Sequence, residues 1–129
     1  MKPELFKSEI FRAVFENSPT GMAILTKTAR VLYGNTKFFE LLEIQESEQN
    51  EGVFLADHIH EEDRPRLLNN IGAMISSEES VEIEVRLTNE HQAEWLRVNA
   101  ASVQYPWTDG FVISALVENI TLRKRTFVV

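Results

Sequence analysis

The sequence predicts an α+β domain in which a five-stranded antiparallel sheet is covered by helices on one face. Two segments in the C-terminal half, residues 81–87 and 95–100, alternate apolar and polar side chains with the period of a half-buried strand. The segment 111–118 is apolar on both faces, which is typical of a central strand or of one whose second face is also covered. Two short apolar segments near the start, 22–26 and 31–33, supply the remaining strands.

A helix with a strong apolar stripe is expected at the start, over residues 4–17, and the Asn-Ser-Pro-Thr-Gly sequence at 17–21 ends it. The stripe is too apolar to face water and consists of Leu5, Phe6, Ile10, Phe11, Val14 and Phe15. Two arrangements would cover it. The helix lies across the outer face of its own sheet, over Trp95, Val112 and Leu116, or it pairs with the same helix of a second copy.

Two further helices are expected in the middle of the chain. Asn35 caps the first with its side-chain oxygen, and that helix carries Phe38, Phe39, Leu41, Leu42 and Ile44. A polar loop follows at 45–52, then a short helical turn at 53–59. The acidic run at 61–63 opens the second helix, which extends to about Ser76 with Pro65 in its first turn. It should bury Leu67, Leu68, Ile71, Met74 and Ile75.

The last three strands are joined by polar turns at 89–92 and 105–110. Alternation directs Ile83, Val85, Leu96, Val98, Ala100, Ile113, Ala115 and Val117 to one inner face. The outer face receives the charged residues of the first two strands and Val112, Ser114 and Leu116 of the third. The chain then ends in the basic sequence Arg-Lys-Arg at 123–125.

Composition excludes several classes of function. The chain of 129 residues has no cysteine, which removes disulfides, thiolate catalysis and thiolate zinc sites, and its net charge of −7 does not suit nucleic-acid binding. No apolar run is long enough to cross a bilayer, so no direct membrane insertion is expected. Because the first residues lack a secretory apolar stretch, the cytoplasm is the expected location.

Six short motifs in order resemble the landmarks of a PAS domain, a sensory module of bacterial signalling proteins. They lie at 17–22, at Asn35 with Phe38, and at 60–63, 82–86, 94–98 and 118–124. The resemblance covers residues 11–125 and implies the strand order 2-1-5-4-3. It divides the chain into an N-terminal helix (1–18), a PAS domain (19–122) and the start of a connector to an output domain (123–129).

The sequence departs from the family pattern at three places. The first hairpin turn, 27–30, has neither the usual Asp nor the usual Gly, and Glu61 stands where Pro is common after the His. The family's closing Asp-Ile-Thr has Asn119 in place of Asp, which weakens any contact with a cation. Glu118 is the expected substitute. The resemblance assigns signal output to Glu118, Asn119, Ile120 and Thr121.

The resemblance also implies a pocket on the inner face. Its lining residues are expected to be Phe38, Leu42, Leu67, Ile71, Met74, Val85, Val98, Ala100, Ile113, Ala115 and Val117. Either the pocket holds a small ligand, or these side chains fill it. The cofactor is left unknown: a cysteinyl flavin is impossible without cysteine, and haem is not favoured because the long helix has no His.

The residues themselves allow two alternatives to a sensory role, a metal site and an enzyme. His58, His60 and the neighbouring carboxylates form a conceivable metal site, but a solvated helix start explains them more simply, so no metal is predicted. A small α+β pocket enzyme is the second alternative. No carboxylate alternates onto the apolar inner face, and there is no phosphate-binding glycine loop, so no catalytic residue is assigned.

The expected function is therefore that of a PAS sensory or regulatory module within a larger signalling protein. It binds a small ligand in its inner pocket or acts as a ligand-free dimerisation relay. The expected partners are a second copy, through Phe6, Ile10, Phe11 and Val14, and an output domain that follows in the same chain. The sequence does not distinguish a histidine kinase from a GGDEF-type diguanylate cyclase as that output domain.

Overall fold

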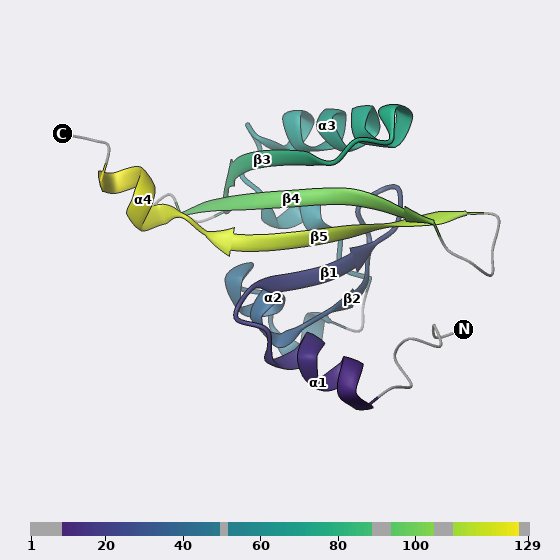
Figure 1. Cartoon of the computed structure of the whole chain (residues 1–129). Helices are drawn as coiled ribbons and strands as arrows, with labels where there is room; N and C mark the ends of the chain where they lie inside the picture. Colours follow the sequence, from purple (N-terminus) through teal and green to yellow (C-terminus); the bar gives the residue numbers. More distant parts are fainter. Residues whose placement is uncertain (1–8, 50–51, 89–93, 105–109, 127–129) are drawn as a thin grey trace.

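A computed structural model describes residues 9–49, 52–88, 94–104 and 110–126 of the chain. The first eight residues, including Phe6, the predicted turn at 89–92, and residues 105–109 of the predicted turn at 105–110 lie outside this part. The elements in chain order are α1 (Glu9–Asn17), β1 (Gly21–Leu25), β2 (Val31–Gly34), α2 (Thr36–Leu41), η2 (Glu46–Glu48), η3 (Leu55–His58), α3 (Arg64–Ser77), β3 (Val81–Arg86), β4 (Trp95–Gln104), β5 (Phe111–Asn119) and α4 (Thr121–Thr126) (Figure 1).

The five strands form one antiparallel sheet with the order β2-β1-β5-β4-β3, as expected. Strand β5 lies in the middle and pairs with β1 on one side and β4 on the other. Three alanines, Ala23, Ala115 and Ala100, are aligned across these three central strands. The central position explains why β5 needs apolar side chains more than the two edge strands do.

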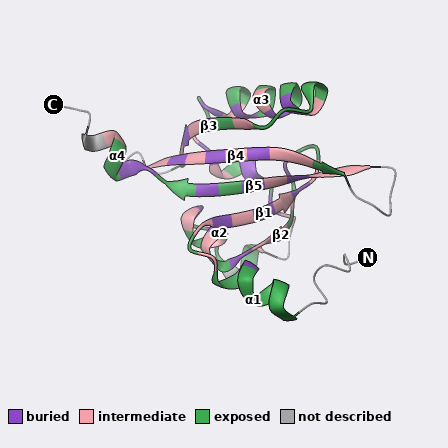
Figure 2. Ribbon diagram, viewed as in Figure 1, coloured by how far each residue is buried: buried purple, intermediate pink, exposed green. Residues whose placement is uncertain are grey.

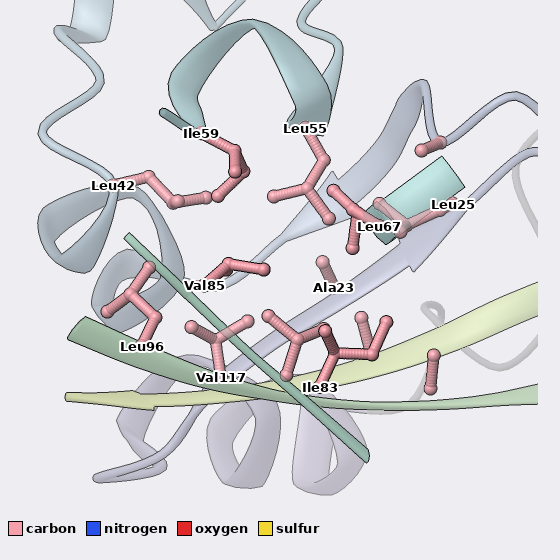
Figure 3. Close-up of a cluster of buried hydrophobic side chains, with 14 of the residues drawn as sticks. Ala23, Leu25, Leu42, Leu55, Ile59, Leu67, Ile83, Val85, Leu96 and Val117 are labelled. Atoms are coloured by element: carbon pink, nitrogen blue, oxygen red, sulfur yellow. The ribbon is translucent and has the colours of Figure 1, made fainter. Parts of the chain in front are cut away.

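The inner face of the sheet packs against α2, η3 and α3 and forms the core. Residues at alternate positions of β1, β3, β4 and β5 are buried there, and Figure 3 shows their side chains meeting Leu42, Leu55, Ile59 and Leu67 from the helical side. The predicted inward positions of the last three strands are all buried. Period-two alternation therefore predicted the inner face correctly.

The turn between β1 and β2 forms without the glycine that the family usually has. Ala29 takes the left-handed conformation, with φ of 64°, and its side chain is fully buried in the core. The Ala29 carbonyl accepts a hydrogen bond from the Leu55 N–H (2.9 Å), and the Val31 N–H donates to the Val53 carbonyl (2.7 Å). These bonds fix η3 beside the hairpin and offset the cost of the left-handed alanine.

Helix α3 begins later than the acidic run predicts. Residues 61 and 62 form a turn before it, and Asp63 at the N-cap uses its side chain elsewhere instead of bonding to the first-turn amides. Pro65 lies in the first turn, as predicted. Leu67, Ile71 and Met74 are buried, whereas the prediction for Leu68 is wrong, because its side chain is 43% exposed on the far side of the helix. Helix α2 ends at Leu41, so that Leu42 is its C-cap.

Helix α1 does not cover the outer face of its own sheet. It packs beside α2, and of its described apolar side chains only that of Phe15 is buried. Ile10 and Val14 are 79% and 65% exposed, and the helix is green along most of its length in Figure 2. Leu116 on the outer face of the sheet is 42% exposed, so α1 does not cover it. Of the two arrangements left open by the sequence, the one in which the helix lies over Trp95, Val112 and Leu116 of the same chain is therefore not the one observed for residues 9–17.

Asn35 fixes the junction between α1, β1 and α2. Its Oδ1 accepts hydrogen bonds from the Phe38 N–H (2.8 Å), which caps α2 as predicted, and from the Met22 N–H (2.9 Å). Its Nδ2 donates to the carbonyls of Phe15 (2.8 Å) and Thr20 (3.0 Å). One fully buried amide thus satisfies four backbone groups from three segments.

In the described parts of the chain, no helix is long and apolar enough to cross a membrane.

Candidate functional site

The structure brings all the predicted pocket-lining residues together on the inner face. Every one of them is at most 2% exposed, and all belong to a single apolar cluster (Figure 3). The buried polar side chains among the described residues are Asn35, Asp63 and Thr121, and each of them is bonded to groups of its own chain. The inner face therefore offers tightly packed carbon, with its polar groups already engaged.

A hollow of about 490 Å³ lies elsewhere, on the surface beside α1 and α2. Apolar side chains, polar side chains and two carboxylates line it, among them Glu16, Thr36, Phe39, Glu40, Ile44 and Gln45. None of these residues was predicted to line a pocket. The sequence carries no signal for this hollow, because its walls come from the end of α1, the end of β2, α2 and the loop after it, whose relative placement depends on the fold.

The exit of β5 is where the predicted output residues meet the start of β4. The Ile120 N–H donates to the Trp95 carbonyl (2.8 Å), and the Trp95 N–H donates to the Thr121 hydroxyl (2.9 Å). Ile120 and Thr121 are both buried. The backbone of Trp95 thus holds the chain at the point where β5 ends and α4 begins.

Where the family usually has a single aspartate, Asn119 makes a backbone hydrogen bond and Glu118 makes an ion pair. The Asn119 Oδ1 accepts a hydrogen bond from the Thr121 N–H (2.9 Å) and so orders the start of α4. The Glu118 carboxylate pairs with the Arg97 guanidinium across the sheet (2.9 Å). The amide thus keeps a backbone bond, and the adjacent carboxylate makes the ionic contact.

Lys124 attaches α4 to the outer face of the sheet. Its Nζ lies 2.6 Å from Glu84 Oε1 on β3 and 4.5 Å from the centre of the Trp95 ring on β4. The hydrogen bond and charge of Lys124 lower the pKa of the Glu84 carboxyl. We call Glu84, Trp95, Arg97, Glu118, Thr121 and Lys124 the exit cluster. Sequence reasoning assigned signal output to two of its members, Glu118 and Thr121, and treated Lys124 only as part of a basic tail.

Asp63 and Arg86 form a second polar cluster at the start of α3. The Arg86 guanidinium donates to both Asp63 carboxylate oxygens (3.0 Å each), and the Arg86 backbone N–H donates to Oδ2 (2.8 Å). The hydrogen bonds and charge of Arg86 lower the Asp63 pKa from 3.8 to about 2, although burial alone would raise it, and the same contacts raise the pKa of Arg86. Sequence reasoning missed this pair, since nothing local distinguishes Asp63 from Glu61 or Glu62.

The two histidines considered as metal ligands have other contacts. The His60 Nδ1 accepts a hydrogen bond from the Glu62 N–H (3.1 Å), and the His58 carbonyl accepts one from the Thr88 N–H (3.0 Å). Within the part of the chain that the structure describes, no group of three or more His, Cys, Asp or Glu side chains is placed to hold a metal ion.

The predicted dimer residues share one surface where they are described. Ile10, Phe11 and Val14 are exposed on α1, and the rings of Phe11 and Phe15 stack with their centres 6.5 Å apart. Phe6 lies outside the described residues. The outer face of the sheet also carries exposed apolar side chains, since Val103 and Leu116 are each more than 40% exposed.

The sheet order, the helices on its inner face and the terminal helix that leaves the central strand define the class of small sensory α+β domains. Comparison with known proteins agrees. A family model described as PAS fold matches residues 9–117, and the chain belongs to the PAS family. This family consists of sensory domains that are generally non-catalytic. No curated protein sequence matches the chain.

Solved structures show the same fold at low sequence identity. The PAS domain of an HTR-like protein from Haloarcula marismortui is 19% identical, with a TM-score of 0.71 over 89% of this chain and 93% of that one. A sensory box histidine kinase/response regulator from Burkholderia thailandensis E264 is 18% identical, with a TM-score of 0.66 over 92% and 89%. The PAS domain of nitrogen regulation protein NR(II) from Vibrio parahaemolyticus is 17% identical, with a TM-score of 0.65 over 88% and 100%.

Proposed function

We propose that the chain is a PAS regulatory module of a cytoplasmic multidomain signalling protein, and that it passes its state to an output domain through β5 and α4. The observation that carries this proposal is the exit cluster. Backbone bonds from Trp95 and the side chain of Lys124 hold α4 against the outer face, so a change in the sheet changes where α4 lies. A helix held by few contacts, most of them half-exposed, has the low local stability that switching elements need.

A histidine kinase is the output domain we favour. Several solved structures with this fold are domains of proteins named as histidine kinases. A GGDEF-type cyclase is the alternative carried from the sequence, and no feature of the described residues favours it. The connector begins within α4, whose register would set the orientation of whichever domain follows.

Lys124→Gln in a fusion tests the output route. Residues 1–129 replace the native PAS domain of a sensor histidine kinase, and autophosphorylation is measured. Loss of the Lys124 contacts with Glu84 and Trp95 should change the rate at least threefold, whereas Glu82→Gln should leave it unaltered. Glu82 lies on the same face, its side chain is 59% exposed, and its carboxylate lies 3.8 Å from the Arg97 guanidinium. Equal rates for the wild-type and Lys124→Gln fusions would refute the route through α4.

The proposed module works without a resident ligand on its inner face. The support for this is the close packing of the eleven predicted lining residues and the engagement of Asn35, Asp63 and Thr121 with their own chain. Ligand sites normally present free polar groups in an apolar cavity. Native mass spectrometry of freshly purified protein, together with an absorbance scan, should give the bare mass of 14.8 kDa per chain and no visible chromophore. A reproducible added mass would reverse this part of the proposal in favour of a bound sensor ligand.

We also propose that the module forms a homodimer through α1. The supporting observation is that one chain exposes two apolar surfaces, the stripe of Ile10, Phe11 and Val14 on α1 and the outer face around Val103 and Leu116. A second copy would cover the exposed apolar side chains of both surfaces with apolar side chains of its own. Their burial would stabilise the dimer by about 25 cal/mol per Å² of apolar surface removed from water.

Val14→Asp tests the dimer, with Ala13→Asp as its matched control. Both substitutions place one carboxylate on an exposed position of α1, but Ala13 lies away from the apolar stripe. Light scattering should give twice 14.8 kDa for the wild type and the control and a single chain mass for Val14→Asp. A wild-type protein that stays monomeric at high micromolar concentration, or a Val14→Asp variant that stays dimeric, would contradict the proposal.

A further inference from the structure

Trp95 is the point where two separately anchored cations meet. The Arg86 guanidinium carbon lies 5.6 Å from the centre of the Trp95 ring, and Lys124 Nζ lies 4.5 Å from it. Arg86 is the direct cross-strand partner of Trp95 in the β3–β4 pairing, whereas Lys124 comes from α4. Both distances are within the range of a cation–π attraction.

The Arg86 side of this arrangement is tied to the start of α3. Asp63 at the N-cap of α3 holds the guanidinium with two parallel hydrogen bonds, and the His60 N–H donates to the Arg86 carbonyl (2.8 Å). From α3 itself, Arg66 donates to the Glu84 carbonyl (2.7 Å). Because α3 buries Leu67, Ile71 and Met74 in the core, a change in core packing that moves α3 also moves Asp63.

The Lys124 side is tied to the outgoing helix. Lys124 sits in α4 and reaches Glu84, which is two residues from Arg86 on the same face of β3. The Trp95 backbone is bonded to Ile120 and Thr121 at the same time. The indole ring and its own backbone therefore both contact the segment that begins α4.

We propose that Trp95 couples the start of α3 to α4, with Arg86 and Lys124 as the two contacts through which the coupling passes. The inference rests on the proposed output role of α4 and adds the input side to it. Movement of Asp63 shifts the Arg86 guanidinium, and this shift changes the contact between Arg86 and the Trp95 indole. The position of the indole then determines whether Lys124 keeps its contact with the ring. Arg86, Trp95 and Lys124 are positioning residues in this scheme, and none of them needs to touch a ligand.

Hydrogen exchange at α4 tests the coupling in the chain of residues 1–129. The readout is the amide at position 124, which donates to the Ile120 carbonyl (3.0 Å), relative to the amide of Val117 in the core strand. Asp63→Asn releases Arg86 and should speed exchange at position 124 about two- to fivefold relative to Val117, the range that one cation–π contact supports. In a Lys124→Met background, Asp63→Asn should give no further acceleration.

Glu61→Gln is the matched control, because it removes an exposed carboxylate two residues from Asp63. It should leave exchange at position 124 unaltered. If Asp63→Asn destabilises the chain too far, Arg86→Lys keeps the charge but loses the paired bonds to Asp63, and it should speed exchange in the same way. Unaltered exchange in both variants, or equal acceleration with and without Lys124, overturns the inference.

The outcomes of this test and of the kinase fusion are separable. Exchange is measured on the module alone, so coupling through Trp95 is judged without any output domain. Suppose that Asp63→Asn speeds exchange at position 124 only when Lys124 is present, and that Lys124→Gln leaves the autophosphorylation rate of the fusion unaltered. That result would uphold the Trp95 inference and refute the proposed output route. A responsive fusion without coupled exchange would do the reverse.

Discussion

Replacing Asp63 by asparagine gives a prediction whose size follows from the structure. Asp63 is 5% exposed and accepts three hydrogen bonds from Arg86, which lower its pKa from 3.8 to about 2. Each pKa unit corresponds to about 1.36 kcal/mol, so the lowered pKa contributes about 2 kcal/mol to the free energy of unfolding at neutral pH. Asparagine has the same shape and can still accept from the Arg86 N–H, so we expect Asp63→Asn to lose about that amount and no more.

The sign of the pH dependence is fixed by the direction of the pKa change. Because the folded pKa is depressed, the unfolded chain binds the proton first on acidification, and the contribution is complete above about pH 5. It falls through the interval from 3.8 to about 2, with roughly half of it lost at pH 3. The stability difference between the wild type and Asp63→Asn should therefore shrink in that interval.

Urea unfolding followed by circular dichroism, between pH 3 and pH 7, measures this difference. Glu61→Gln is the control and should remain within about 0.5 kcal/mol of the wild type throughout, as exposed substitutions usually do. A difference below about 0.5 kcal/mol at pH 7 would falsify the reasoning. So would a difference that stays constant down to pH 3, because it would then come from packing and not from the ionised carboxylate.

Three further substitutions test other parts of the structure, each by urea or thermal unfolding. Asn35→Ala leaves four backbone groups without their partner and should cost about 3–4 kcal/mol, and a loss below about 1 kcal/mol would show that water replaces the amide. Glu78→Gly should stabilise the chain by about 0.5–1 kcal/mol, because the exposed Glu78 ends α3 in the left-handed conformation with φ of 63°, which glycine adopts without strain. A destabilised variant would contradict this. Gly34→Ala should destabilise by at least about 1 kcal/mol, since its Cβ would lie 2.9 Å from the Phe38 and Phe39 rings, and a neutral result would mean that the rings move freely.

The sheet and its inner face could be predicted because they depend on regular alternation. Burial at alternate positions in the central parts of β3, β4 and β5 follows directly from the order of apolar and polar side chains. The cap at Asn35 was predictable for a similar reason, since it is a local contact with a residue three positions on. The other three bonds of Asn35 were not, because they reach residues up to 20 positions away.

Long-range polar pairs are where sequence reasoning fell short. Asp63 and Arg86 are 23 positions apart, and Glu84 and Lys124 are 40 apart, so no spacing rule connects them. The fate of α1 was also undetermined, because an apolar stripe says that a surface needs cover without saying what covers it. The error at Leu68 has a simpler cause: the residue next to a buried Leu67 on a helix points about 100° away from it.

The ion pairs that hold the two cations around Trp95 differ in their access to water, and this gives the molecule unequal sensitivity to ionic strength. The Glu84 and Lys124 side chains are 36% and 38% exposed, so dissolved ions compete with their attraction, and the screening length shortens from about 30 Å at 0.01 M salt to about 8 Å at 0.15 M. Asp63 is 8% exposed on its side chain and is held by paired hydrogen bonds, so salt reaches it poorly. Rising salt should therefore loosen α4 while the start of α3 stays anchored, so that α4 responds to ionic strength more than the start of α3 does.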